Sequence, residues 1–157
     1  MAYEKKRAGY VFSDDKKRLD LNRIEAFMHE SYWASGRTRL QIERSIGNSL
    51  CFGIYRVEDG MQVAFARAVT DCVTFAWLCD VFVDASERGH GLGKMLVESI
   101  DAHPDLQGLR RWILATRDAH GLYKQFGYTP LANPGAWMER IATIPSQRPR
   151  RPRTSRA

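Results

Sequence analysis

The sequence predicts one α/β domain of the α+β type, with a mixed, mostly antiparallel sheet of six or seven strands and about four helices. Two observations predict this class. Residues 49–83 are aromatic and β-branched runs separated by turn residues, which is typical of a β-meander. Helical patterns precede this region, and a helix, a strand and another helix follow it. A chain of 157 residues, 44% of them hydrophobic, has the usual size of one domain and can bury a core.

The N-terminal half begins with a short strand at residues 9–13 and two helices. Apolar residues at Leu21, Ile24, Phe27 and Met28 indicate a helix over residues 21–33. Residues 35–38 interrupt the pattern. A second, short helix is predicted at residues 40–46, because Gly47 and Asn48 then stop it.

The meander and the C-terminal half follow. Three antiparallel strands are expected within residues 49–83, with a tight Asp59-Gly60 hairpin between the first two. Next come a helix that starts near Leu92 and ends at His103-Pro104, a strand at 110–116, and a helix at 119–126 closed by Gly127. One or two last strands are predicted in residues 128–144.

The charge lies mostly at the C-terminus. The chain has 24 basic and 18 acidic residues, a net charge of +6, and five arginines fall in residues 145–157, which contain no acid. We therefore expect one domain at residues 1–144 and a flexible Arg/Pro-rich tail at residues 145–157. Such a tail would bind nucleic acid only weakly and in a salt-dependent way, or would contact an acidic partner.

The cysteines and the N-terminus favour a cytoplasmic protein. Cys51, Cys72 and Cys79 are odd in number and have no metal-ligand spacing, so we expect buried free thiols. The charged N-terminus does not resemble a signal peptide, and no apolar run is long enough to span a membrane.

A glycine-rich turn carries the clearest sign of chemistry. A buried strand ends near Val83, Gly89, Gly91 and Gly93 follow, and a helix begins at once. Such a turn presents backbone N–H groups at the positive end of a helix dipole, where phosphate binds. The positions do not match a Walker A loop or the dinucleotide fingerprint G-x-G-x-x-G.

The turn does match R-x-x-G-x-G, from Arg88 to Gly93, and here the chain resembles the GNAT superfamily of acyl-CoA-dependent N-acetyltransferases. Val83 lies five residues before Arg88, as is usual in that family, and Asp80 stands where Glu or Asp is frequent. The stretch from Leu122 to Tyr128 resembles the family's L-Y-x-x-x-G-F/Y ending. The similarity covers most of the chain and implies the GNAT fold.

The resemblance also implies a co-substrate, acetyl-CoA, and direct attack of a primary amine on its thioester in a ternary complex. Backbone amides from the glycine turn would hold the pyrophosphate, and the pantetheine arm would pair with the strand before it. Metal is not expected. The implied acetyl-CoA-binding residues are Val81, Phe82, Val83, Arg88, Gly89, His90, Gly91, Leu92, Gly93, Lys94, Thr116 and Tyr123.

Two residues are candidates for proton transfer. Tyr123 matches the family position whose hydroxyl can protonate the departing thiolate, and within this motif we favour that role over packing in the core, the usual place of a Tyr at such helical spacing. Asp80 could take a proton from the acceptor, or it could face solvent or pair with an arginine. Thr116 stands where many members have Asn, and Asp118 is expected to be a helix N-cap.

The acceptor is the least defined part. By resemblance, the helix-loop-helix of residues 28–44 shapes its pocket, which gives Tyr32, Trp33, Arg37 and Arg39 as candidate contacts. The two arginines would suit an amine that also carries a carboxylate or phosphate. A rival interpretation is a domain that binds acyl-CoA without transferring the acyl group. Trp137 and Met138 fit either a monomer core or an apolar homodimer patch.

Overall fold

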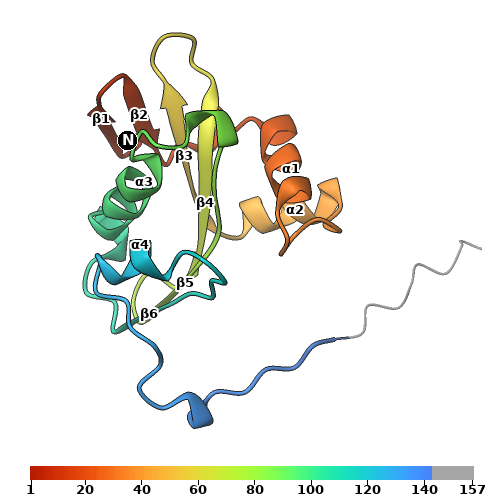
Figure 1. Ribbon diagram of the computed structural model, residues 1–157, viewed down its shortest axis with the longest axis vertical. Helices are drawn as coiled ribbons and strands as arrows, with labels where there is room; N and C mark the ends of the chain where they lie inside the picture. Colours follow the sequence, from red (N-terminus) through yellow and green to blue (C-terminus); the bar gives the residue numbers. More distant parts are fainter. Residues whose placement is uncertain (143–157) are drawn as a thin grey trace, which may run out of the picture.

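The computed structural model describes residues 1–142, which form one six-stranded sheet in the order β1-β2-β3-β4-β5-β6 (Figure 1). Neighbouring strands are antiparallel except β5 and β6, which are parallel. The mixed, mostly antiparallel sheet predicted from the sequence is therefore confirmed. The strands are β1 (Glu4–Arg7), β2 (Tyr10–Ser13), β3 (Leu50–Arg56), β4 (Gln62–Thr70), β5 (Phe75–Val83) and β6 (Arg111–Ile113).

Four α-helices cover the two faces of the sheet (Figure 1). On one face, α1 (Leu21–Glu30) and α2 (Arg39–Gly47) bury Ile24, Phe27 and Ile42 against the sheet. On the other face, α3 (Leu92–Asp101) packs Leu92, Met95 and Leu96 onto the central strands, with α4 (His120–Lys124) beside it. The four predicted helices are all present, with ends shifted by a few residues.

Local sequence explains why the first two helices start where they do. The Asp20 side chain accepts from the backbone N–H groups of Asn22 and Arg23 at the start of α1. Thr38 and Gln41 form a capping box at the start of α2.

The structure corrects three expectations. The hairpin of β1 and β2 was foreseen only in its second strand, because β1 is built from Glu4, two lysines and Arg7 and has no apolar pattern. Within residues 128–142 there is no strand, only a 3₁₀ turn at Pro134–Ala136, because two prolines interrupt the segment. Cys72 is exposed in the turn between β4 and β5, whereas Cys51 is buried and Cys79 half-buried. The predicted tail at residues 145–157 lies outside the described residues.

The two parallel strands separate soon after they meet, and this opens the sheet. β5 pairs with β6 only through Phe75, Ala76 and Trp77, whereas it continues to Val83 alongside β4. From Leu78 onward, the edge of β5 that faces away from β4 has no strand partner among residues 1–142. The fold therefore leaves an open strand edge beside the glycine-rich turn. Among the described residues, no helix has the length and apolar character needed to cross a membrane.

Candidate active site

A β-bulge in β5 shapes the centre of this opening. The register with β4 shifts between the pairs Phe65–Phe82 and Arg67–Cys79, so that Asp80 and Val81 together lie opposite Ala66. Asp80 has a φ of 52°, in the left-handed region that Asp tolerates better than most residues. The bulge bends the strand and turns the Asp80 side chain into the protein.

The carboxylate of Asp80 is buried in a cluster of donors. Oδ2 accepts from Arg37 Nη1 at 2.7 Å and from Arg67 Nε at 2.9 Å, and Oδ1 accepts from Trp33 Nε1 at 3.2 Å. Arg67 also donates to Ser49 Oγ. Burial raises the pKa of Asp80, but the hydrogen bonds and charges of the two guanidinium groups outweigh it and hold the pKa below its ordinary value.

This environment argues against Asp80 as a general base, one of the two roles that the sequence left open. A base must bind a proton near neutral pH, and a carboxylate held by two arginines binds one poorly. The structure instead shows Asp80 paired with arginine, the alternative to the role of base. Asp80 thus fixes Arg37, whose side chain is 27% exposed, at the wall of the opening.

The glycine-rich turn leads from β5 into α3 with an exposed helix start. Gly89 and Gly91 have φ values of 87° and 73°, which other residues adopt only with strain. Gly91 is the N-cap of α3, and no side chain accepts from the first turn of the helix. The backbone N–H groups at this end are therefore available to an anion.

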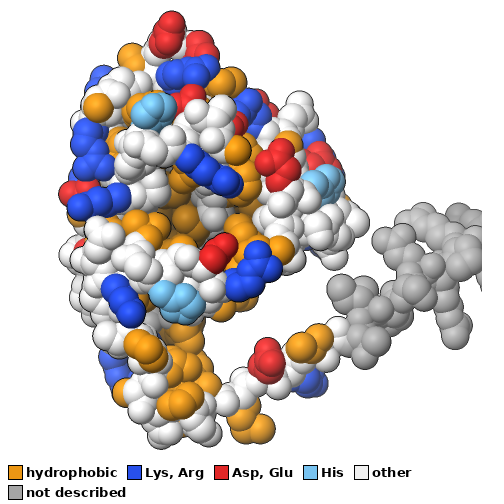
Figure 2. All heavy atoms as spheres, viewed as in Figure 1, with side chains coloured by type: hydrophobic (Ala, Val, Ile, Leu, Met, Phe, Trp, Pro, Cys, Tyr) orange, Lys and Arg blue, Asp and Glu red, His pale blue; other side chains and the backbone are white. Residues whose placement is uncertain are grey.

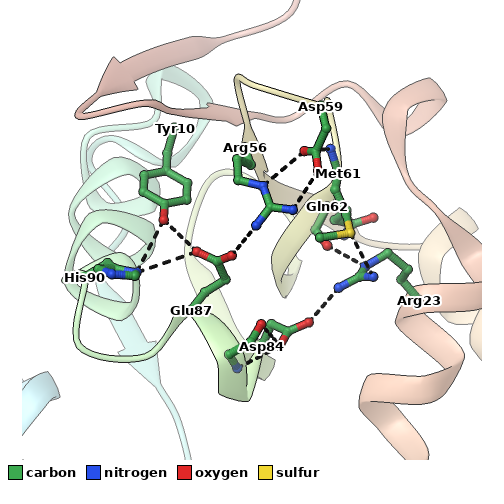
Figure 3. A network of polar contacts seen from close by, with 10 residues as sticks. Tyr10, Arg23, Arg56, Asp59, Met61, Gln62, Asp84, Glu87 and His90 are labelled. Carbon is green, nitrogen blue, oxygen red and sulfur yellow. Dashed lines mark hydrogen bonds and ion pairs between the residues drawn. The ribbon is translucent and has the colours of Figure 1, made fainter.

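A buried polar network braces the same turn (Figure 3). The side chain of Glu87, 7% exposed, accepts from the Tyr10 hydroxyl and from Arg56 Nη1, both at 2.6 Å, and His90 lies 3.6 Å away. At the start of the turn, Asp84 accepts from Arg23 Nη2 at 2.6 Å. Three elements, β2, α1 and β3, thus hold the turn through Tyr10, Arg23 and Arg56. None of these three residues was foreseen, because nothing local marks contacts that span 31 to 77 positions.

A cavity of about 530 Å³ lies where β5 and the segment after β6 separate. Figure 2 shows a hollow in this region of the molecule, with apolar side chains on its floor and basic side chains at its margin. The wall contributed by β5 includes the Asp80 bulge, and the facing wall consists of residues 115–119 together with Tyr123. The loop after α1 and the start of β5 add aromatic side chains, Tyr32, Trp33 and Trp77, which are 49%, 42% and 45% exposed.

Tyr123, in the cavity wall, is the candidate proton donor. It lies on α4, is 7% exposed, and lines both this cavity and a neighbouring one. Its hydroxyl makes no hydrogen bond within residues 1–142, and it is not fully enclosed by the protein. Burial, with smaller contributions from Tyr32 and Asp118, raises the pKa of Tyr123 to about 12, so the phenol stays protonated at neutral pH.

Cys79 also lines the cavity, next to Asp80. Burial raises the pKa of its thiol to about 11. The thiolate, which is the nucleophilic form, is therefore scarce at neutral pH. The cavity holds no activated cysteine that would favour an acyl-enzyme.

The structure brings most of the candidate residues together, with three exceptions in detail. The Phe82 side chain stacks on Phe27 in the core and does not face the opening. Residues 81–83 therefore offer their backbone edge. Leu92 is likewise a core residue. Arg39 faces away from the cavity, where it pairs with Glu25 and Glu43 on the outer surface of the helices. Exposed residues on the turn are Arg88, Gly89, His90, Gly91 and Lys94, and Gly93 is half-buried.

The start of α4 differs from the expectation. Thr116 Oγ1 accepts from the backbone N–H of Ala119 at 3.0 Å, and Asp118 makes no cap. The predicted N-cap at Asp118 is therefore wrong, because the N-cap residue of α4 is Ala119 and the helix has no side-chain cap. Across the cavity mouth, the Arg117 N–H donates to the Tyr32 hydroxyl at 3.2 Å, and the Arg117 guanidinium lies 3.8 Å from the Tyr32 ring centre.

The comparisons with known proteins agree with this arrangement. The model of the acetyltransferase (GNAT) domain family matches residues 49–130, just over half of the chain. The chain belongs to this GNAT family. The matched region contains the meander, the glycine-rich turn and Tyr123.

Individual relatives of this GNAT protein support the same fold. A crystal structure from Xanthomonas campestris pv. campestris, assigned to the GNAT acetyltransferases, is 45% identical with a TM-score of 0.83, and the match covers 87% of this chain and 96% of that one. A Gibberella zeae protein assigned as an acetyltransferase is 29% identical over 138 residues, 74% of this chain and 77% of that protein. A Clostridium acetobutylicum acetyltransferase structure with acetyl-CoA has 12% identity and a TM-score of 0.59, covers 84% of this chain and 94% of that one, and shows likeness of fold alone.

The residues of this GNAT chain also fit an acyl-CoA by their own geometry. The unpaired edge of β5 can accept an extended amide chain, and the uncapped start of α3 can accept a phosphate. Among residues 1–142, no group of three or more His, Cys, Asp or Glu side chains could hold a metal ion.

Proposed function

We propose that this protein transfers the acetyl group of acetyl-CoA to a primary amine by direct attack in a ternary complex. The observation that carries the proposal is the convergence of three features on one opening: the unpaired edge of β5, the uncapped start of α3, and Tyr123 on the cavity wall. Backbone N–H groups from residues 89–94 would bind the pyrophosphate, and residues 81–83 would pair with the pantetheine amides.

Tyr123 is the proposed general acid. Its neutral phenol would donate a proton to the sulfur as the thioester breaks, while the amine nitrogen forms the new amide bond. The high thiol pKa of Cys79 supports transfer without a covalent enzyme intermediate. Because Asp80 is held by two arginines, we assign it a positioning role, and the acceptor amine would reach the site in its neutral form.

We further propose that the acceptor carries an anionic group and an apolar part next to its amine. Arg37 bonds Asp80 through Nη1 alone, which leaves its other N–H groups for a carboxylate or phosphate. Tyr32, Trp33 and Trp77 provide the apolar contacts. Replacement of Arg37 by Ala should raise KM for carboxylated amines and leave neutral amines of the same shape unaffected. Arg39→Ala is the matched control, because Arg39 lies off the cavity.

The test of the proposed function begins with acetyl-CoA binding. Titration calorimetry on the wild type and on Gly91→Glu should show binding that the variant loses, because the added carboxylate occupies the phosphate position. Thiol release with an amine panel should then show turnover, and Tyr123→Phe should lower kcat by about 100-fold with binding unchanged. Binding without turnover on any amine would favour the alternative, a domain that binds acyl-CoA without transfer. No binding by folded wild type would overturn the acyl-CoA proposal.

A further inference from the structure

Asp118, in the segment between β6 and α4, has a carboxylate without a role in the function proposed above. It lines the cavity of about 530 Å³, here called the acceptor cavity, and it is exposed. Within residues 1–142 its side chain makes no hydrogen bond, ion pair or helix cap. The other carboxylate of this cavity, Asp80, is held by Arg37 and Arg67. Among the described residues, Asp118 is therefore the carboxylate of the acceptor cavity that is available to a ligand.

Another cavity, of about 280 Å³, adjoins the acceptor cavity. Residues 81–83, to which the proposed function assigns the pantetheine arm, line this cavity, and we call it the acyl channel. Four residues line both cavities, namely Tyr32, Trp33, Val81 and Asp118. The two cavities therefore meet at Asp118, where the thioester and the acceptor amine would come together.

Asp118 also lies near Tyr123, the candidate proton donor. Burial is the main cause of the raised pKa of Tyr123, and Tyr32 and Asp118 make smaller contributions in the same direction. A carboxylate has such an effect only at short range. Residues 115–119 and Tyr123 form one wall of the acceptor cavity. The carboxylate that can bind an amine and the hydroxyl that would protonate the sulfur thus share one wall.

The charges on the cavity lining favour an acceptor with one negative charge. Three arginines and two aspartates line the acceptor cavity, a net charge of +1, namely Arg37, Arg67, Arg117, Asp80 and Asp118. Arg67 is held by Asp80. The Arg117 guanidinium lies over the ring of Tyr32. Arg37 keeps N–H groups for a ligand, and the lining matches a single carboxylate better than a phosphate, which carries about −1.5 to −2 at pH 7.

We propose that the acceptor is a free amino acid with an apolar side chain, bound with its amine on Asp118 and its carboxylate on Arg37. The inference rests on the proposed function, because it names the acceptor of that same site. Tyr32, Trp33 and Trp77 would pack against the apolar side chain. The cavity volume of about 530 Å³ lies within the usual range of small-molecule sites, about 300 to 1,000 Å³.

Asp118 would also take part in the transfer step. When the amine nitrogen forms its bond to the acetyl carbon, the nitrogen becomes positively charged and has to release a proton. The Asp118 carboxylate would accept this proton and, because the residue is exposed, pass it to water. As the C–S bond breaks, its electron pair goes to the sulfur, which takes a proton from Tyr123, and water returns a proton to Tyr123. The products are the N-acetyl amino acid and CoA, and no further reactant is needed.

Calorimetric titration of the protein saturated with CoA, which has no acetyl group to transfer, tests the two contacts without turnover. Three probes differ by one group: phenylalanine has both charged groups, phenylpropanoate lacks the amine, and phenethylamine lacks the carboxylate. The wild type should bind phenylalanine about tenfold more tightly than either analogue, because each analogue leaves one charged side chain without its partner.

Each substitution should remove one preference only. Asp118→Asn should bind phenylalanine and phenylpropanoate about equally and should still prefer phenylalanine to phenethylamine. Arg37→Ala should show the opposite pattern. The control Glu58→Gln makes the same charge change at an exposed residue in the turn between β3 and β4, and it should bind all three probes as the wild type does. A merely structural role of Asp118 would weaken all three probes alike in Asp118→Asn, and this result would contradict the proposal.

The outcomes separate the amino-acid acceptor from the proposed function. If the wild type binds CoA and acetylates other amines but not phenylalanine or leucine, the proposed function stands and the amino-acid acceptor is overturned. An Asp118→Asn variant that keeps both wild-type preferences would also overturn it. If the wild type does not bind CoA, the proposed function fails, and the same titrations without CoA still decide whether Asp118 and Arg37 bind an amino acid.

Discussion

Asp80→Asn isolates the charge of the cluster at the bulge of β5. Asn has the same shape as Asp and also tolerates a φ of 52°, so the backbone of the bulge should persist. The change removes the one negative charge that holds Arg37 and Arg67. It leaves two guanidinium groups close together with only a neutral amide between them.

The exposures of the three side chains set the size of the effect. Asp80 is 3% exposed, Arg67 10% and Arg37 27%. Breaking a fully buried ion pair costs about 3 to 5 kcal/mol, and the partial exposure of Arg37 places this case at the lower end, about 3 kcal/mol. For a chain of this size, that loss corresponds to a fall in Tm of about 6 to 12 °C.

Thermal and urea unfolding of wild type, Asp80→Asn and Asp118→Asn measure this loss. Asp118 lines the same cavity but is exposed and makes no cap, so its substitution should change stability by less than about 0.5 kcal/mol. The pKa of Asp80 is lowered in the folded state, so its contribution is present above its ordinary pKa and is lost as pH falls through the folded value. The difference in Tm should therefore be constant from pH 5 to 8 and should shrink below about pH 4.

A double-mutant cycle with Arg67→Met completes the test. If Asp80 and Arg67 interact as described, the two changes should be coupled by at least about 1 kcal/mol. An Asp80→Asn variant as stable as the wild type, or additive effects in the cycle, would refute the view that Asp80 is a charged positioning residue.

Three further predictions concern other parts of the molecule. Glu87→Gln should weaken acetyl-CoA affinity about tenfold, because Tyr10 and Arg56 then hold the turn less firmly. The control Asp59→Asn also removes a partner of Arg56 but should leave the affinity unchanged. Equal losses of affinity in the two variants would contradict the bracing role of Glu87. Tyr55→Phe should leave the free energy of unfolding unchanged or raise it by up to about 1 kcal/mol, because the Tyr55 hydroxyl is buried without a partner among the described residues. A lower free energy of unfolding in urea would show that the hydroxyl makes a stabilising contact. If neutral Tyr123 is the proton donor, activity falls only as pH rises through its pKa of about 12, so kcat/KM should show no alkaline decline up to pH 10.5. A decline centred near pH 10 would exclude Tyr123 as that donor.

Sequence reasoning succeeded where local chemistry sets the structure. The positions of α1 and α2 follow from apolar spacing, although their caps, Asp20 and Thr38, were not predicted. The start of α3 follows from glycines that must adopt positive φ, above all Gly91. These features depend on residues that are close together in the chain, so their pattern is visible in the sequence.

The missed features depend on long-range contacts or on weak local patterns. Whether Asp80 would be a base or an ion-pair partner depends on Arg67 and Arg37, which lie 13 and 43 positions away. The role of Glu87 depends on Tyr10, 77 positions away. β1 forms because it pairs with β2, although its own residues are charged. The expected strand after Tyr128 does not form within residues 128–142, because two prolines interrupt a segment with little apolar pattern.

The charge of strand β1 affects whether the sheet can pair edge to edge with the sheet of another molecule. A sheet with an unpaired strand at each edge can polymerise. Here the edge opposite β6 is β1, which consists of Glu4, two lysines and Arg7. Glu4 pairs with Arg18, and Arg7 pairs with Glu98. Lysine and other charged side chains on an edge strand oppose pairing with the edge of another sheet. The β1 edge is therefore protected against aggregation by strand addition.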